Sequence, residues 1–488
     1  MESSEHVWIG NELFLKFDTG RVAAKGLPLR ITLQEGGGQT MTYGQGIALG
    51  GDFYGVVGAP ISTADDRPGA FRAAWASLVN ATHGERAAIL SILQREIDAV
   101  EKAIAEGKQP STAYDGLGDS LSYLWTAVTM FRYVLLAMEN WDHFGEHAVA
   151  AYTAGHAVAC LEAGLAASPN ITPAEKRARL ERAYAMNSFA DHFMTDLFST
   201  GHLRVPRKEL YDFGTDKATL GKLARAMHNE DSRYGLHVRN ADKREWRAFG
   251  DKMLLDTVSA ENRRFVVKAA QVSADEIWDA YQGHKIENRA LQLVPDHEAV
   301  TDDTTNQPAL FVLHQKEVWR RINMSDRRDR EWTPNWEVWP TYVDLPKPDD
   351  PPYRHVRCSD MASGKFLGWL SVTQDNLNNV GIDPDQTRAH GIKWGIYGKD
   401  LYLQKDTKGG DRYLGLGTGS LATWGLWSGW RNPVVYNDDG TVSLASAPQR
   451  KLYASTMFQG RLGLSWSDGS PNEWLIRIDN PLPEPTEG

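Results

Sequence analysis

Two residues four positions apart, His192 and Asp196, have the types and spacing that could hold a divalent metal ion. In an α-helix such residues lie on one face about one turn apart, so an imidazole and a carboxylate can bind the same ion. Nitrogen and oxygen ligands together suit zinc. Thr200 and Gly201 indicate the end of that helix, which would let the chain turn and present His202 beside the same face. The sequence therefore predicts a metal site centred on this segment.

Further candidate ligands lie in segments that we expect to be neighbouring helices or turns. His143 and His147 are again four apart, and His228 lies three residues before Asp231. Asp52 follows two glycines, whose backbone freedom lets a carboxylate be aimed inward. A single pair of this kind is more often a surface or capping pair. Here the groups fall in apolar surroundings, where a shared metal would supply the partners that buried His and Asp require.

The segments around these residues carry helix signals. Apolar residues recur at steps of three and four from Ala87 to Ile104, which predicts an amphipathic helix. A second helix is expected over roughly 115–140, where threonines and an arginine interrupt the apolar stretch and indicate a buried helix rather than a membrane span. Capping boxes predict helix starts at Thr172, where proline follows, and at Ser273.

The same signals divide the chain into parts. Residues 1–300 are predicted to form an all-helical metal-dependent domain after an irregular, glycine-rich start over 1–65. Residues 301–353, with their run of proline and aspartate, are predicted to be a linker. Residues 354–488 have short β-prone runs and glycine-containing turns. We therefore expect an α+β multidomain protein in which an all-α domain precedes an all-β domain.

The β-prone region contains a short internal repeat. Leu-Gly recurs at positions 367, 414 and 462, at nearly equal intervals. Three copies of one β unit predict a pseudo-threefold fold, with a β-trefoil as the first choice and a sandwich as the second. Trp424, Trp427 and Trp430 are close enough in sequence to cluster. Such side chains usually pack inside a small β domain, but they also favour membrane interfaces and sugar faces, so targeting to a membrane or a glycan is a hypothesis.

Composition limits the class of partner. The 488-residue chain has a net charge of −10, which argues against a general nucleic-acid binder that needs a basic face. Its start lacks the basic and then apolar pattern of a signal peptide, so we expect a cytoplasmic protein or export by a non-classical route. Cys160 and Cys358 fall in different predicted domains, which makes a structural disulfide improbable.

The spacing His192-x3-Asp196-x5-His202 resembles the zinc-dependent phospholipase C family, which also includes single-strand-specific zinc nucleases. The resemblance covers roughly residues 40–285. It implies an all-helical fold and a cluster of two or three Zn²⁺ ions, in which Asp196 would bridge two of the ions. The other ligands that it implies are Asp52, His143 with His147 as the competing choice, His228, and Asp231 with Glu230 as the competing choice.

The resemblance leaves the ligands of a third zinc open. The family uses the amino group of its first residue together with a nearby histidine. Here the chain starts at Met1 without a segment that matches, and His6 is only a weak substitute. Named ligands are therefore predicted for two ions.

A zinc cluster with these ligands is suited to phosphoester hydrolysis. No P-loop and no Gly-x-Ser-x-Gly motif occurs in the sequence. The resemblance implies cleavage on the glycerol side of the phosphate of a phospholipid substrate, releasing diacylglycerol and a phosphorylated head group. Asp52 would be a ligand or the base that orients the attacking water. The acidic charge is compatible with zwitterionic lipid, with peripheral contact to a membrane surface and with no nucleic-acid partner.

Two other functions fit the same residues. A metal-dependent nuclease of the same fold should place aromatic and cationic side chains around the cluster. A lectin-like or toxin binding protein would use zinc structurally and close the site with four protein ligands.

Overall fold

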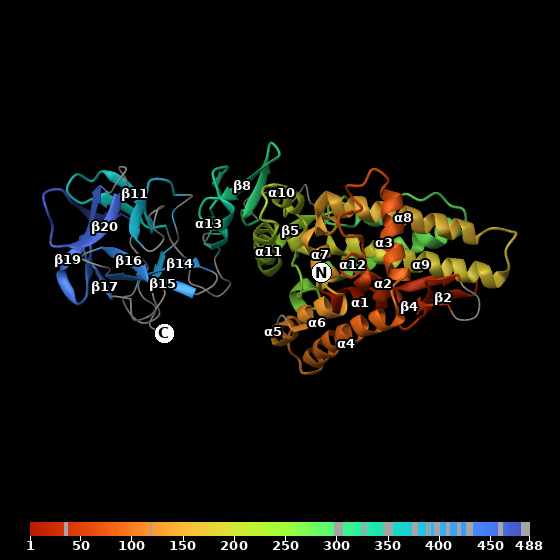
Figure 1. Ribbon diagram of the computed structural model, residues 1–488. Coiled ribbons are helices and arrows are strands. Elements are labelled where there is room, and N and C mark those ends of the chain that lie inside the picture. The colour runs from red at the N-terminus through yellow and green to blue at the C-terminus, as the bar shows by residue number, and fades with distance from the viewer. Residues whose placement is uncertain are drawn as a thin grey trace. The chain divides into compact units, whose positions relative to one another are not determined.

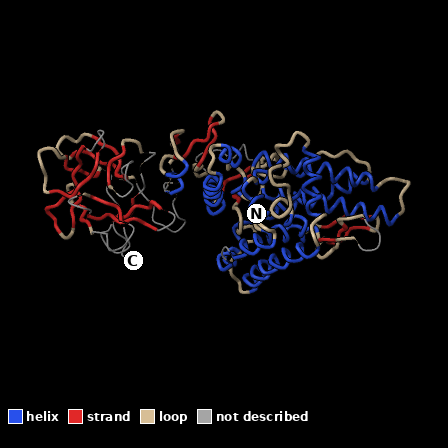
Figure 2. Tube along the Cα trace, viewed as in Figure 1, coloured by secondary structure: helices blue, strands red, loops and turns tan. Residues whose placement is uncertain are grey.

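The computed structural model places the chain in two compact units, Met1–Ala309 and Leu310–Gly488. Helices make up most of the first unit and strands most of the second (Figures 1 and 2). The structure describes residues 1–33, 38–117, 120–296, 306–324, 327, 329–343, 345, 355–372, 379–386, 389, 392–394, 401–406, 410–416, 421–425, 433–456 and 462–479.

The first unit is a helical assembly with short hairpins between the helices. Its α-helices are α1 (Ser3–Asn11), α2 (Tyr43–Leu49), α3 (Arg67–Val79), α4 (His83–Ala105), α5 (Ser111–Leu117), α6 (Ser120–Val128), α7 (Arg132–Met138), α8 (Gly145–Ala166), α9 (Pro173–Asp196), α10 (Arg207–Asp212), α11 (Lys217–Tyr234) and α12 (Ala260–Tyr281). Its 3-10 turns are η1 (Asn140–His143), η2 (Thr200–His202), η3 (Thr257–Ser259) and η4 (Arg289–Gln292). Its hairpins are β1 (Phe14–Phe17) with β2 (Gly20–Ala23), β3 (Leu29–Arg30) with β4 (Thr40–Met41), and β5 (Leu236–Arg239) with β6 (Glu245–Ala248).

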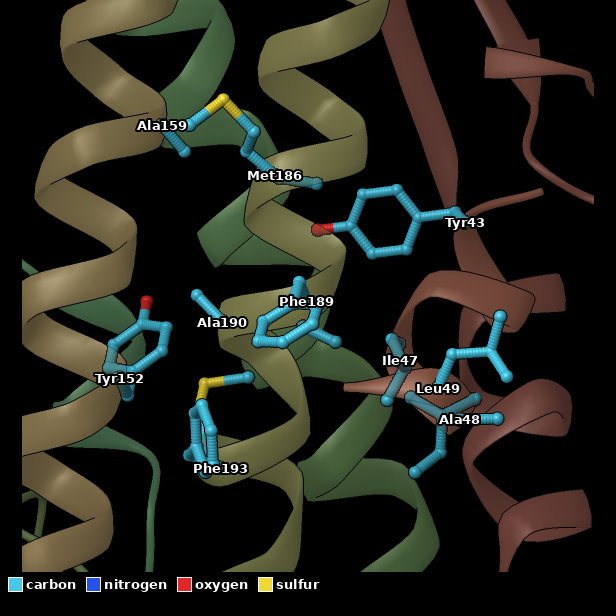
Figure 3. Close-up of a cluster of buried hydrophobic side chains, with 14 of the residues drawn as sticks. Tyr43, Ile47, Ala48, Leu49, Tyr152, Ala159, Met186, Phe189, Ala190 and Phe193 are labelled. Carbon is cyan, nitrogen blue, oxygen red and sulfur yellow. The ribbon is translucent and has the colours of Figure 1, made fainter. Parts of the chain in front are cut away.

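Helix α9 is the centre of this unit. It packs along α8 and also contacts α2 and α12. Every residue from Ala183 to Asp196 is buried, so the second half of α9 is covered on all sides. Figure 3 shows Phe189 and Phe193 of α9 between α8, which carries Tyr152, and α2. The last turn of α9, which carries the predicted metal ligands, is therefore held rigidly by the packing around it.

One predicted helix start is confirmed and another is wrong. Thr172 caps α9, and its side chain accepts the N–H of Glu175 as the capping box requires. The predicted start at Ser273 is wrong, because Ser273 lies inside α12 and its hydroxyl donates to Asp191 instead of capping. The start over 1–65 is not irregular, since it contains α1, α2 and two hairpins. The β5–β6 hairpin likewise interrupts the region predicted to be all-helical.

The expected buried helix over 115–140 is also wrong. Helices α6 and α7 meet at 110°, and the chain bends where Met130 and Phe131 both have positive φ. The bend turns apolar side chains outward, including those of Tyr123 and Leu135. Helix α8 is also long and apolar enough to cross a membrane. In contrast to α6 and α7, 61% of its most apolar 18-residue segment is buried inside the unit, as in the core helix of a folded domain.

The second unit contains a closed six-stranded barrel. Its elements are β7 (Phe311–His314), β8 (Glu317–Arg321), β9 (Trp332–Thr333), α13 (Val338–Val343), β10 (Arg357–Asp360), β11 (Phe366–Val372), β12 (Val380–Asp383), β13 (Ile392–Trp394), β14 (Leu401–Asp406), β15 (Gly410–Leu416), β16 (Ala422–Gly425), β17 (Val434–Tyr436), β18 (Val442–Leu444), β19 (Ala447–Thr456), β20 (Leu462–Ser467) and β21 (Trp474–Ile478). The antiparallel order β19-β20-β12-β11-β10-β21 closes because β21 also pairs with β19. Strands β13 to β16 form a separate four-stranded sheet.

Part of the predicted linker is folded. Strands β7, β8 and β9 form a three-stranded sheet within 301–353, and α13 follows them, so the second unit begins well before the predicted residue 354. The Leu-Gly repeats fall in β11, β15 and β20. Two of these strands belong to the barrel and the third to the four-stranded sheet. Of the predicted tryptophan cluster, Trp427 and Trp430 lie outside the described residues, as does the side chain of Trp424.

Helices α1 and α2 approach so closely that only glycine fits between them. A Cβ on Gly10 would lie 2.4 Å from Gly44 Cα and 2.5 Å from Gly44 N. We predict that Gly10→Ala pushes α1 away from α2 and lowers the free energy of unfolding of the first unit by roughly 1–3 kcal/mol. Gly84→Ala is the matched control, because a Cβ there meets nothing within 4 Å. Equal denaturant midpoints for the two variants would contradict the close approach.

Candidate metal centre

His192 and Asp196 lie in the last turn of α9, and both side chains are buried. His192 Nδ1 lies 2.8 Å from the backbone oxygen of Ile47 in α2, to which it donates its proton. This bond leaves a lone pair on Nε2, which lies 3.4 Å from Asp196 Oδ2. The predicted i, i+4 geometry is therefore present, and a backbone oxygen fixes the tautomer in the way that metal-binding histidines require.

The first group of possible ligands joins Asp52, His143 and His192, whose nearest ligand atoms lie within 4.8 Å of one another. His143 Nδ1 lies 2.7 Å from Asp196 Oδ2 and 3.0 Å from His192 Nε2. Gly51 is necessary here: its φ is +69°, and a Cβ would lie 2.7 Å from the His143 ring. The sequence thus predicted these three ligands, and the structure brings them together.

The turn η1 places only one of the two upstream histidines, His143, in a group of possible ligands. Asp142, beside His143, accepts the backbone N–H groups of Ile61 and Ser62, and this holds the turn in place. His147 lies one helical turn further on, and its Nδ1 lies 2.9 Å from Ser62 Oγ. His147 belongs to none of the ligand groups formed by the residues that the structure describes, whereas His143 does.

The second group joins His202, His228 and Asp251. His202 donates from Nδ1 to the backbone oxygen of His143 at 2.9 Å, so its Nε2 lone pair lies 3.6 Å from Asp251 Oδ1. His228 Nε2 lies 3.2 Å from Asp251 Oδ2. Two of the three residues, His202 and His228, were predicted from the sequence.

Asp231, the predicted partner of His228, is wrong as a ligand. Its two carboxylate oxygens each accept a 2.9 Å bond from the guanidinium of Arg204, which commits the group to an ion pair away from the cluster. The competing choice, Glu230, belongs to none of the groups formed by the described residues. Asp251 takes the position instead, although it lies far beyond His228 in the sequence.

Asp251 is positioned by two contacts that the sequence alone does not reveal. The Gly250 N–H donates to the backbone oxygen of Ser232 at 3.0 Å and ties the loop to α11. Glu5 of α1 accepts the N–H groups of Lys252 and Leu254 on the other side. The one available signal was the dipeptide Gly250-Asp251, which repeats the glycine-then-aspartate pattern seen before the first group.

A third group forms at the start of the chain, where the sequence left the ligands open. His6, His192 and Asp196 have ligand atoms within 4.8 Å. The Met1 amino group is buried there and lies 2.7 Å from Asp196 Oδ1, 3.1 Å from Asp251 Oδ1 and 3.4 Å from His202 Nε2. His6, judged a weak substitute from the sequence, is thus part of the cluster.

The His6 ring shows why a cation fits this place. The Thr195 hydroxyl donates to backbone oxygens of α9, so it accepts from His6 Nδ1 at 3.0 Å. Nε2 then carries a lone pair, and it lies 3.3 Å from Asp196 Oδ1. Among the described residues, none gives this buried nitrogen a hydrogen bond. His6 Nε2 and Asp196 Oδ1 are thus close enough to bind one cation together.

The electrostatics give three of these residues, Asp196, His192 and His202, the protonation states of metal ligands. Burial alone would raise the pKa of Asp196, but the Met1 ammonium and the hydrogen bond to His143 lower it well below its ordinary value. Burial lowers the pKa of His192 strongly, and burial with the Met1 ammonium lowers that of His202 to about 4. At neutral pH the carboxylate is charged and both imidazoles are neutral, as ligation requires.

The amino group itself behaves differently. Burial favours its neutral form, but Asp196 and Asp251 outweigh burial and raise the pKa of the Met1 amine to about 12. The ammonium therefore supplies positive charge between two carboxylates. A metal ion that bound this amine would have to displace its proton.

Known proteins do not identify the cluster: no family model, no curated protein and no solved structure matches this chain. The residues themselves define three groups that could hold metal ions. Each group contains a histidine whose ring nitrogen lies within 4 Å of a carboxylate oxygen of Asp196 or Asp251.

The choice of Asp251 over Asp231 can be tested with two matched substitutions. We predict that Asp251→Asn reduces the zinc retained after dialysis by about one ion per chain, because the second group loses its carboxylate. Asp231→Asn breaks the Arg204 pair but should leave the zinc content unchanged. Atomic absorption on both purified variants measures this. Loss of zinc from Asp231→Asn alone would contradict the assignment.

The buried amino group can be tested by lengthening the chain. One glycine added before Met1 moves the amine and puts an amide where it lies now, so we predict lower zinc content and a lower unfolding temperature. One glycine added after Gly488 is the control and should change neither. If the extended N-terminus binds zinc as the parent chain does, the amine takes no part in the centre.

Proposed function

We propose that the first unit is a zinc-dependent phosphodiester hydrolase of the phospholipase C type. The observation that carries this proposal is the position of Asp196. Its carboxylate lies within 3.4 Å of His143, His192 and His6 and of the Met1 amine. One carboxylate that is shared by several nitrogen ligands supports a cluster of ions rather than one isolated site.

Zinc suits the ligand set, which consists of imidazoles and carboxylates. Bound ions would lower the pKa of nearby water and stabilise negative charge on phosphoryl oxygens. The protein's part is positioning: Asp196 and Asp251 hold ligands from several helices in one place. Asp52 is half-buried, so it can serve as a ligand or accept the proton of the attacking water.

The substrate that we propose is a phospholipid, cleaved on the glycerol side of its phosphate. The support is the resemblance of His192-x3-Asp196-x5-His202, to which the structure adds His6 and the Met1 amine near the same carboxylate. The net charge of −10 is compatible with a zwitterionic head group such as phosphocholine. The products would be diacylglycerol and a phosphorylated head group.

For the second unit we propose a β-trefoil that binds a membrane or a glycan. The six-stranded barrel supports this proposal. The Leu-Gly repeats do not occupy equivalent strands, because β11 and β20 belong to the barrel and β15 to the four-stranded sheet. An accessory domain of this kind would increase the local concentration of the enzyme at its substrate.

An activity assay with three substrates tests the proposed reaction. We predict release of phosphocholine from phosphatidylcholine, abolished by a chelator and restored by zinc. Asp196→Asn should reduce the rate on the order of a hundredfold or more, because the carboxylate shared by the ligand groups is lost. Asp98→Asn, an exposed carboxylate on α4, is the control and should keep full activity.

The same assay with single-stranded DNA and RNA separates the alternatives. Cleavage of nucleic acid without cleavage of lipid would replace the proposal with a nuclease of the same site. Bound zinc without turnover of any substrate would indicate a structural metal in a binding protein.

A further inference from the structure

The hairpin of α6 and α7 exposes an unusual set of large apolar side chains. Met130, Phe131 and Tyr123 are 85%, 67% and 74% exposed. We call the whole set the hairpin surface; its members are Tyr123, Leu124, Met130, Phe131, Val134 and Leu135. Large apolar side chains exposed in this number on one short helical hairpin point to a binding site.

The backbone holds these side chains outward at a cost. Met130 and Phe131 have φ of 48° and 68°, a conformation that large side chains rarely adopt. The neighbouring residues on the inner side, Trp125 and Thr129, are buried and hold the turn against the unit. The turn is therefore strained, and it exposes the apolar side chains of Met130 and Phe131.

The chemistry of the hairpin is that of a lipid-facing segment. Arg132 is the single charged residue from Ser120 to Met138. Its guanidinium is engaged with Glu85 and with the backbone oxygen of Phe53. Taken together the two helices are apolar enough to cross a membrane, and the chain bends by 110° between them. A surface without free charge suits a neutral or zwitterionic lipid.

The hairpin is joined directly to the candidate metal centre. Arg132 donates to Phe53, the residue after Asp52, at 3.0 Å. The Tyr133 ring stacks on the Phe53 ring with centroids 5.4 Å apart. Helix α7 then leads into η1, which carries His143. The hairpin surface is therefore attached through packed side chains to two of the segments that supply ligands.

We propose that the hairpin surface inserts into the interface of a zwitterionic phospholipid layer and holds the metal centre against its head groups. This inference rests on the proposed function for its choice of lipid. Insertion itself can be measured without any cleavage, so the two proposals can fail separately.

The cysteine content of the chain allows a direct measurement of insertion. Cys160 and Cys358 are the only cysteines and both are buried, so a new exposed cysteine can be labelled selectively. An environment-sensitive fluorophore is attached to Phe131→Cys in one protein and to Leu161→Cys in another. Leu161 is 61% exposed on α8 and serves as the control. With phosphatidylcholine vesicles we expect a blue shift from the label at 131 and none from the label at 161.

A double substitution tests whether the hairpin surface carries the binding. Met130→Asn with Phe131→Asn removes the apolar groups, while asparagine tolerates the left-handed backbone. We expect vesicle partitioning to weaken about tenfold or more, because each buried apolar group contributes to interfacial affinity. Leu161→Gln with Leu165→Gln removes two exposed apolar groups from α8 and should leave partitioning unchanged.

Phosphocholine release measured in the same samples separates the outcomes. Insertion at 131 without release supports the docking surface and rejects the proposed reaction. Release without a shift at 131, or with equal partitioning of both double variants, overturns the docking surface. A dimer in solution that the Asn double variant abolishes would also overturn it, because a second copy of the chain would then cover the hairpin.

Discussion

The rest of the first unit depends on a buried negative charge, the carboxylate of Asp196. It is 1% exposed and lies at the end of a helix whose second half is covered on every side. An ion in such a place is tolerated only if positive charge and hydrogen-bond donors surround it. The first unit meets this need with the Met1 ammonium and with the imidazole of His143, each 2.7 Å from an oxygen of Asp196.

This requirement explains much of the architecture around α9. Helix α1 enters the core far enough to bury Met1, and its close approach to α2 brings His6 to the same carboxylate. Helix α2 supplies the backbone oxygen that orients His192. Glu5 connects α1 to the loop that carries Asp251. Each helix next to the cluster thus both packs in the core and orients a ligand, so changes in packing and in metal affinity should be coupled.

Local sequence patterns predicted the parts of the site that local geometry determines. His192, Asp196 and His202 could be found because helical periodicity and a helix stop fix their relation. Asp52 and His143 were candidates from the residues themselves, the family resemblance favoured His143 over His147, and the structure brings Asp52 and His143 together. Asp251 and the Met1 amine were missed because long-range packing places them. The same limit applies to 115–140, where two left-handed residues turned an expected buried helix into an exposed hairpin.

The central claim is that several metal ions share ligands around Asp196. Anomalous diffraction at the zinc absorption edge from crystals grown with zinc tests it most directly. The account predicts at least two peaks among the three ligand groups, with Asp196 bound to at least two of the ions. A single peak enclosed by four protein ligands, or peaks that leave Asp196 without a metal, would contradict it.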